Sequence, residues 1–151
     1  MADALAPEIV SLTLPSRLEL LVVLDRVALA ICERMEFDPD ASSQLSMAVI
    51  EAGTNAVQHG HLRDASKTFD ARFLMFEDRL EVEVRDTGRG FDVQALTLDV
   101  TTPDRILEMR GRGIFIMRAC CDTVDFHFGS DGTLCRLVKY RAASAQRAAD
   151  A

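Results

Sequence analysis

Hydrophobic and polar positions recur along this chain with two periods, and each period predicts one kind of element. Residues 80–85 read LEVEVR, in which every second side chain is apolar, as in a strand with one buried face. In residues 17–35 the apolar side chains return every three or four positions, which predicts a helix with one buried stripe. Ser16 precedes that helix and is a typical cap, because its hydroxyl can accept a free backbone N–H.

A second helix is predicted over residues 41–59, where Gly60 is placed to end it. Its apolar stripe consists of residues at helical spacing: Leu45, Ala48, Val49, Ala52 and Ala56. Residues 91–110 carry no period and are expected to form a mobile segment. Turn residues and shorter patterns predict the remaining elements, which are strands at 8–14, 68–76, 123–128 and 133–141 and a helix at 113–121.

The predicted order is a strand, two helices, a hairpin, the aperiodic segment, a helix and a second hairpin. Mostly antiparallel strands with helices in separate blocks are typical of an α+β fold. We expect a two-layer sandwich in which helices cover one face of a mostly antiparallel mixed sheet. One domain is expected over residues 1–151, with its core at about 9–140 and a frayed tail at 142–151.

Composition and charge argue against several classes of function. The 151 residues carry a formal net charge of -7, and an acidic surface is unsuited to the phosphates of nucleic acid. No apolar run approaches the ~20 residues of a membrane-spanning helix, and the start MADALAPE is unlike a signal peptide, so we expect a cytoplasmic protein. The four cysteines have no metal-binding spacing and are expected to be buried, reduced thiols.

The second predicted helix carries three polar residues four positions apart, Glu51, Asn55 and His59, which would share one face. Taken alone, such a row is typical of a solvated helix surface. Small residues beside it, Ala52 and Gly53, would let another group pack closely. The row is therefore a candidate site in combination with other motifs.

Asp86 leaves the end of a predicted strand into a loop that contains Gly88 and Gly90. Glycines let a backbone approach a ligand closely, and the carboxylate can accept hydrogen bonds from a purine amino group. The same composition is common in plain acidic turns. This loop is a second candidate.

A third candidate is the run Arg110-Gly111-Arg112-Gly113, which opens the predicted third helix. Free N–H groups and the positive end of a helix favour phosphate oxygens, and the arginines would add cationic donors. The alternative is a pair of glycines that serves only a tight turn, and no lysine follows as it does in a P-loop.

The order of these three motifs resembles the nucleotide-binding boxes of the GHKL ATPase superfamily, which includes gyrase-type ATPases, Hsp90, MutL and histidine kinases. In size and wording the chain is most similar to the serine kinase/anti-sigma factors of bacterial partner-switching systems. Their helix motif E-x-x-T-N-A-x-x-H-G is matched from Glu51 to Gly60, and their G-x-G-I-x-I-M run is matched from Gly111 to Met117. The resemblance extends over about residues 9–140.

The resemblance implies a role for each matched residue. Asn55 would coordinate Mg²⁺ on the phosphates of ATP, and Glu51 would be the general base toward an attacking hydroxyl. Asp86 would hold the adenine amino group with support from Thr133. Gly88 and Gly90 would admit the nucleotide. The phosphates would be cradled at the end of a lid, residues 92–110, by Arg110, Gly111, Arg112 and Gly113.

The implied activity is that of a serine/threonine-protein kinase and anti-sigma factor. It would phosphorylate an anti-sigma factor antagonist on Ser or Thr, sequester a sigma factor and act as a homodimer. A switch kinase that acts on a scaffold protein without binding a sigma factor would keep the same motifs. A nucleotide-gated binding module without phosphotransfer is a third interpretation, although it would not need Glu51 as a base. The order of three motifs disfavours a plain α+β protein in which they are coincidental.

Overall fold

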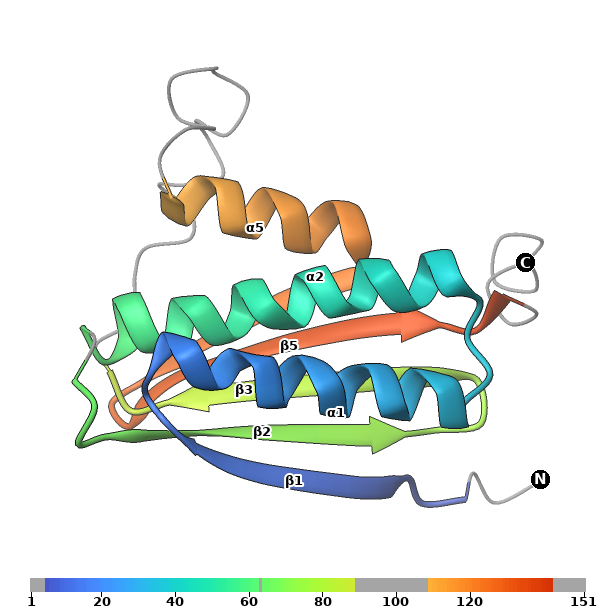
Figure 1. Ribbon diagram of the computed structural model, residues 1–151, viewed down its shortest axis with the longest axis horizontal. Helices are drawn as coiled ribbons and strands as arrows, with labels where there is room; N and C mark the ends of the chain where they lie inside the picture. The colour runs from blue at the N-terminus through green and yellow to red at the C-terminus, as the bar shows by residue number, and fades with distance from the viewer. Residues whose placement is uncertain (1–4, 63, 89–108, 143–151) are drawn as a thin grey trace.

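Five strands form one sheet in the computed structural model, which describes residues 5–62, 64–88 and 109–142 (Figure 1). The strands are β1 (Glu8–Pro15), β2 (Thr68–Met75), β3 (Arg79–Asp86), β4 (Thr123–Gly129) and β5 (Gly132–Tyr140). Their order across the sheet is β1-β2-β3-β5-β4, and each pairing in this described part is antiparallel. Because β5 runs antiparallel beside β3, the first residues of β5 meet the last residues of β3.

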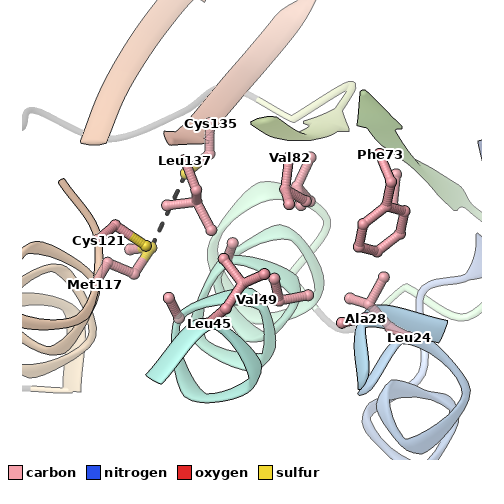
Figure 2. Close-up of a cluster of buried hydrophobic side chains, with 14 of the residues drawn as sticks. Leu24, Ala28, Leu45, Val49, Phe73, Val82, Met117, Cys121, Cys135 and Leu137 are labelled. Carbon is pink, nitrogen blue, oxygen red and sulfur yellow. Dashed lines mark hydrogen bonds between the residues drawn. The ribbon is translucent and has the colours of Figure 1, made fainter. Parts of the chain in front are cut away.

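The helices of the described residues lie on one face of the sheet. They are α1 (Leu21–Arg34), α2 (Pro39–Asn55) and α5 (Met109–Cys120), with a 3₁₀ turn, η1 (Leu18–Leu20), before α1 and a π-helical turn, η2 (Ala56–Gly60), after α2. Figure 2 looks along these helices and shows α2 between α5 and α1, with the strands on the far side of the core. The predicted α+β sandwich with helices on one face is confirmed.

The core fills the layer between helices and sheet, where the predicted apolar stripes face the strands (Figure 2). Leu24 of α1 and Leu45 of α2 are fully buried there, as are Phe73 and Val82 of the sheet. Full burial of such a side chain contributes about 1.5–3 kcal/mol. This layer therefore holds the ends of the strands and helices in place.

The four cysteines are free and buried, as predicted. Burial raises the pKa of the Cys32 thiol to about 11 and that of the Cys121 thiol to about 12, so both stay protonated at neutral pH. The Cys135 sulfur lies 3.9 Å from the Met117 sulfur in the same layer (Figure 2). These thiols act as packing residues.

The starts of the first two helices differ from the prediction. Ser16 is not a cap: the first helical segment begins as a 3₁₀ turn with no side-chain cap, and the Ser16 hydroxyl contacts His61 instead. α2 begins two residues early, because the Asp38 carboxylate accepts the Ala41 N–H at 2.8 Å and Pro39 suits the first helical position.

The start of α5 also differs from the prediction. It begins at Met109, four residues early, so Gly111 and Gly113 lie within the helix and do not open it. Glycine predicts a boundary because it costs about 1 kcal/mol relative to alanine inside a helix. Packing of α5 against α2 outweighs that cost. The first turn of α5, which holds the free N–H groups, therefore includes Arg110 and Gly111.

Candidate functional site

The sequence motifs meet at one end of the sandwich, on the left in Figure 1. At this end α2 and β3 finish while α5 and β5 begin. Antiparallel pairing of β3 with β5 and packing of α5 on α2 bring these four termini together. Three motifs that are far apart in the chain therefore border one region.

Glu51 and Asn55 lie one turn apart on α2, beneath Gly113 of α5. A Cβ built on Gly113 would lie 2.8 Å from Glu51 Oε2 and 3.6 Å from Asn55 Oδ1. The missing side chain thus lets the α5 backbone approach both polar groups. Asn55 is buried, although amide side chains are mostly exposed in proteins. This pair belongs to a close helix–helix approach and not to a solvated helix surface.

Burial and a nearby arginine act in opposite directions on the pKa of the Glu51 carboxyl. Burial raises its pKa above the ordinary glutamate value, while the positive charge of Arg112 opposes the shift. A raised pKa means that the carboxylate binds a proton more tightly than a solvated one does. Arg112 is exposed on α5, so its guanidinium can face an anion in solvent as well as Glu51.

The third member of the predicted row, His59, does not continue it. The helix widens into the π-helical turn η2 from Ala56, so the α-helical period on which the row was predicted ends at Asn55. π-Helical turns of this kind are frequent at functional sites. Here the turn leads from Asn55 to Gly60 and His61, which contact the Asp86 loop.

Asp86 and Thr133 are direct partners in the register of β3 and β5. Burial raises the pKa of Asp86, and the shift is opposed by a hydrogen bond from the Gly88 N–H at 2.8 Å, by His61 and by the Thr133 backbone. The Thr133 hydroxyl is buried and has no hydrogen-bond partner among the described residues. A buried hydroxyl beside a buried carboxylate is suited to a polar ligand that supplies the missing partner.

Glycines let the Asp86 loop pack closely against the end of η2. A Cβ on Gly60 would lie 2.4 Å from the Asp86 carboxyl carbon, and a Cβ on Gly88 would lie 1.7 Å from the Gly60 carbonyl oxygen. Gly132, with φ of 130°, comes equally close: its Cβ would lie 1.9 Å from the Asp86 carbonyl oxygen. A side chain at Gly60 or Gly88 would push the loop away from η2, and one at Gly132 would displace the Asp86 backbone.

His61 is a site residue that sequence reasoning missed. It is buried directly after η2, and its Nε2 lies 3.0 Å from both the backbone nitrogen and the hydroxyl of Thr87. Its Nδ1 lies 2.5 Å from the Ser16 hydroxyl. A histidine just past a predicted helix end gives no signal of these contacts, because both partners are remote in sequence.

Other predicted site residues lie at or beyond the edge of the described residues. Gly90 and residues 92–108 of the expected lid lie outside the described residues. Arg110 and Gly111 lie in the first turn of α5, without a described side-chain position for Arg110.

Comparison with known proteins shows the family of this chain. The family model of the histidine kinase-like ATPase domain matches residues 14–139. The chain belongs to the histidine kinase-like ATPase family. Within this family it is similar to proteins named serine-protein kinase RsbW. It is 30% identical to that of Halalkalibacterium halodurans over 139 residues, which cover 89% of this chain and 84% of the relative.

Two further relatives carry the same name. The Bacillus subtilis protein is 32% identical over 120 residues, which cover 76% of this chain and 75% of the relative. The Listeria monocytogenes protein is 30% identical over 137 residues, which cover 87% of this chain and 86% of the relative. The predicted kinase family is thereby confirmed, and the chain is placed among the serine-protein kinases of the histidine kinase-like ATPase family.

A histidine kinase-like ATPase uses ATP, and the residues present fit an adenine nucleotide. The Thr133 hydroxyl, which has no partner among the described residues, and the Asp86 carboxyl offer two acceptors at neighbouring buried positions. The close approach at Gly113 places Asn55 and Glu51 against α5, one turn after the start of that helix, where free N–H groups favour a phosphate. In the described residues, no helix has the length and apolarity needed to cross a membrane.

Proposed function

We propose that this protein is an ATP-dependent serine/threonine-protein kinase and anti-sigma factor. It binds ATP with Mg²⁺, phosphorylates an anti-sigma factor antagonist on Ser or Thr and sequesters a sigma factor. The observation that carries the proposal is the pairing of Glu51 with Asn55 under Gly113, with the pKa of Glu51 raised by burial. A pure nucleotide-binding module would have no use for such a base.

Asp86 and Thr133 hold the adenine end of the nucleotide in this proposal. The Asp86 carboxylate accepts from the adenine amino group, and the Thr133 hydroxyl gains the partner that it lacks among the described residues. Gly88 and Gly132 keep the backbone around Asp86 closely packed, which holds its carboxylate in position.

Asn55 and the start of α5 hold the phosphate end. The Asn55 amide oxygen is a hard ligand of the kind that Mg²⁺ takes alongside phosphate oxygens and water. Arg110, Gly111, Arg112 and Gly113 lie in the first half of α5, where backbone N–H groups and guanidinium groups favour phosphate. Bound Mg-ATP supplies a γ-phosphoryl group activated for transfer.

Glu51 acts on the nucleophile. It takes the proton of the substrate hydroxyl as the bond from that oxygen to the γ-phosphorus forms and the bond from the γ-phosphorus to the bridging oxygen breaks. ADP leaves with the bridging oxygen, and the proton stays on Glu51 until it passes to solvent. Partial burial suits the carboxylate to hold that proton.

The partners follow from the resemblance. The acceptor is an anti-sigma factor antagonist, the sequestered protein is a sigma factor, and the kinase acts as a homodimer in the cytoplasm. The relatives are named serine-protein kinases, which supports a protein acceptor.

Transfer of labelled γ-phosphate from Mg-ATP to a candidate antagonist of the same genome tests the proposal. Glu51→Gln should lower transfer at least 100-fold while ATP still binds, because only the proton acceptor is lost. Asn55→Ala should weaken Mg-dependent ATP binding. Glu33→Gln, an exposed carboxyl on α1, is the matched control and should leave transfer unchanged.

The outcomes separate the candidate functions. Label on a Ser or Thr of the antagonist, lost in both site variants, supports the kinase. ATP binding without transfer to any candidate would indicate a nucleotide-gated binding module. Transfer to a scaffold protein without sigma binding would indicate a switch kinase that is not an anti-sigma factor.

A further inference from the structure

His61 joins three segments of the chain at the adenine end of the site. It directly follows η2, it contacts Ser16 just after β1, and it contacts Thr87 just after β3. Both His61 and Ser16 are almost completely buried, with 2% and 1% of their surface exposed. The imidazole is therefore the polar link between the Asp86 loop and the rest of the core at this end.

The contacts determine the tautomer of the ring. The Thr87 backbone N–H can only donate, and it points to Nε2 at 3.0 Å. Nε2 must therefore be the unprotonated nitrogen, and the Thr87 hydroxyl can donate to it as well. Nδ1 then carries the proton and donates to the Ser16 hydroxyl at 2.5 Å. If Nε2 carried the proton, two N–H donors would face each other and neither would have an acceptor.

The surroundings of the ring favour its neutral form. Burial lowers the pKa of His61, and Lys67 acts in the same direction, whereas Asp86 and Asp64 raise it. Asp86 faces the ring from the end of β3, and Asp64 and Lys67 face it from the segment before β2. The loss of solvation outweighs both carboxylates, so the ring accepts from Thr87 at neutral pH.

We propose that His61 is a positioning residue for the nucleotide, which as a neutral, Nδ1-protonated imidazole fixes Thr87 and thereby the Asp86 carboxylate beside Thr133. This inference rests on the proposed function, in which Asp86 holds adenine. Gly60 and Gly88 allow the loop to lie against η2, and they leave no side chain of their own to hold it there. The His61 ring supplies that hold, because its Nε2 accepts from both the backbone N–H and the hydroxyl of Thr87.

The structure predicts a specific pH dependence of ATP binding. Protonation of His61 puts a proton on Nε2, which removes the acceptor of the Thr87 N–H and releases the loop. The pKa of His61 is lowered from an ordinary value of about 6.5, so affinity should be full at pH 7.5 and above and should fall only as the pH drops through that lowered pKa. In a variant without a titrating side chain at position 61, this part of the pH dependence of ATP affinity should be absent.

Titration calorimetry of Mg-ATP binding between pH 8 and pH 5 tests the proposal on the full chain. At pH 8 His61→Gln should bind about tenfold more weakly than wild type, since an aligned acceptor is lost. The ratio of the wild-type affinity to the variant affinity should shrink toward one as the pH falls. Protonation of ATP changes both affinities equally, so it does not alter this ratio. Ser16→Ala should also weaken binding, although Ser16 contacts only the far nitrogen of the ring. His127→Gln, an exposed histidine on β4, is the matched control and should bind as wild type.

A second measurement needs no nucleotide and separates this inference from the proposed function. Nitrogen NMR of the His61 ring, assigned by its loss in His61→Gln, should show the Nδ1-protonated neutral form at pH 7.5. The Nε2-protonated form or a cation at that pH overturns the proposal even if His61→Gln is poorly folded. A folded His61→Gln whose affinity ratio to wild type is constant across the pH range also overturns it. If wild type binds no ATP, the proposed function fails, and the ring tautomer still decides the hydrogen-bond arrangement.

Discussion

Thr133 has a hydroxyl that is buried and without a partner among the described residues. Burying a polar group without a hydrogen-bond partner costs about 1–3 kcal/mol. Such a hydroxyl is therefore expected where a bound ligand supplies the partner. The same corner holds the Asp86 carboxyl, whose pKa is raised by burial. At the scale of single residues, the site is therefore less stable than the core around it, as binding sites generally are.

Thr133→Val tests this residue directly. Valine has nearly the same shape and removes the unpaired hydroxyl, so the free energy of unfolding should rise by about 1 kcal/mol. ATP affinity should fall at the same time, because the adenine end loses a contact. Denaturant unfolding and calorimetric binding measure the two effects, and Thr123→Val, at an exposed position of β4, is the control for both. A loss of stability in Thr133→Val would mean that the hydroxyl has a partner in the folded protein.

The close approach of α5 to α2 is the feature that makes the site at the scale of elements. Gly113 lies over Glu51 and Asn55, and Gly53 lies over α1 in the same way: its Cβ would be 2.7 Å from a Leu21 methyl carbon. Both glycines lower helix propensity. Gly113 allows α5 to pack closely against α2, and Gly53 allows α1 to do the same. Their positions reflect packing between helices and not helix formation.

Gly113→Ala should separate stability from activity. Alanine gains about 1 kcal/mol of helix propensity, which offsets part of the strain of a Cβ 2.8 Å from Glu51 Oε2. We expect a thermal midpoint within a few degrees of wild type and a fall in phosphotransfer of more than tenfold, because Glu51 is displaced. Ala119→Gly, at an exposed position of the same helix, should lose about 1 kcal/mol of stability and keep full transfer. Full activity in Gly113→Ala would remove Glu51 from the reacting centre.

The pH dependence of stability belongs to the whole molecule. Burial raises the pKa of Glu51 and of Asp86, so the folded chain favours their protonated forms. Their contribution to the free energy of unfolding is fully present below about pH 4, near the ordinary pKa values of carboxyl groups. It is lost as the pH rises through the higher pKa values that the two groups have in the folded protein. His61 acts in the opposite sense: with its pKa lowered, it costs stability as the pH falls below about 6.5.

Neutral replacements of the two carboxyls should therefore stabilise the fold. Glu51→Gln and Asp86→Asn should unfold at higher temperature than wild type at pH 7–8, and the difference should close near pH 4. Thermal unfolding across that range, with Glu33→Gln as the control, measures the effect. Site variants no more stable than wild type at pH 8 would show that water or a nearby charge already compensates these carboxylates.

The order of elements and the fold class were predictable, because periodicity reports which side chains face the core. LEVEVR predicts β3 correctly, yet Glu81 within it is buried and not exposed. Its carboxylate pairs with Arg79 at 2.8 Å and with Arg136 from β5. Although burial raises the pKa of Glu81, the two guanidinium groups hold it below its ordinary value. A cross-strand arginine cannot be seen in the period of a single strand.

Helix ends were the least predictable elements, because they depend on competition between local partners. Ser16 had the right chemistry for a cap, but its hydroxyl is taken by His61. Gly111 and Gly113 had the composition of a boundary, but helix packing extends α5 past them.

By itself the sequence determined the elements, the family motifs and the chemistry available to them, since those follow from residue type and short-range spacing. Only the tertiary structure decided which groups meet: Gly113 over Glu51, Thr133 beside Asp86, and His61 between Ser16 and Thr87. The His61 contacts join residues 45 and 26 positions apart. Periodicity describes one element at a time, whereas these contacts exist because the sheet and helices bring the ends of different elements to one place.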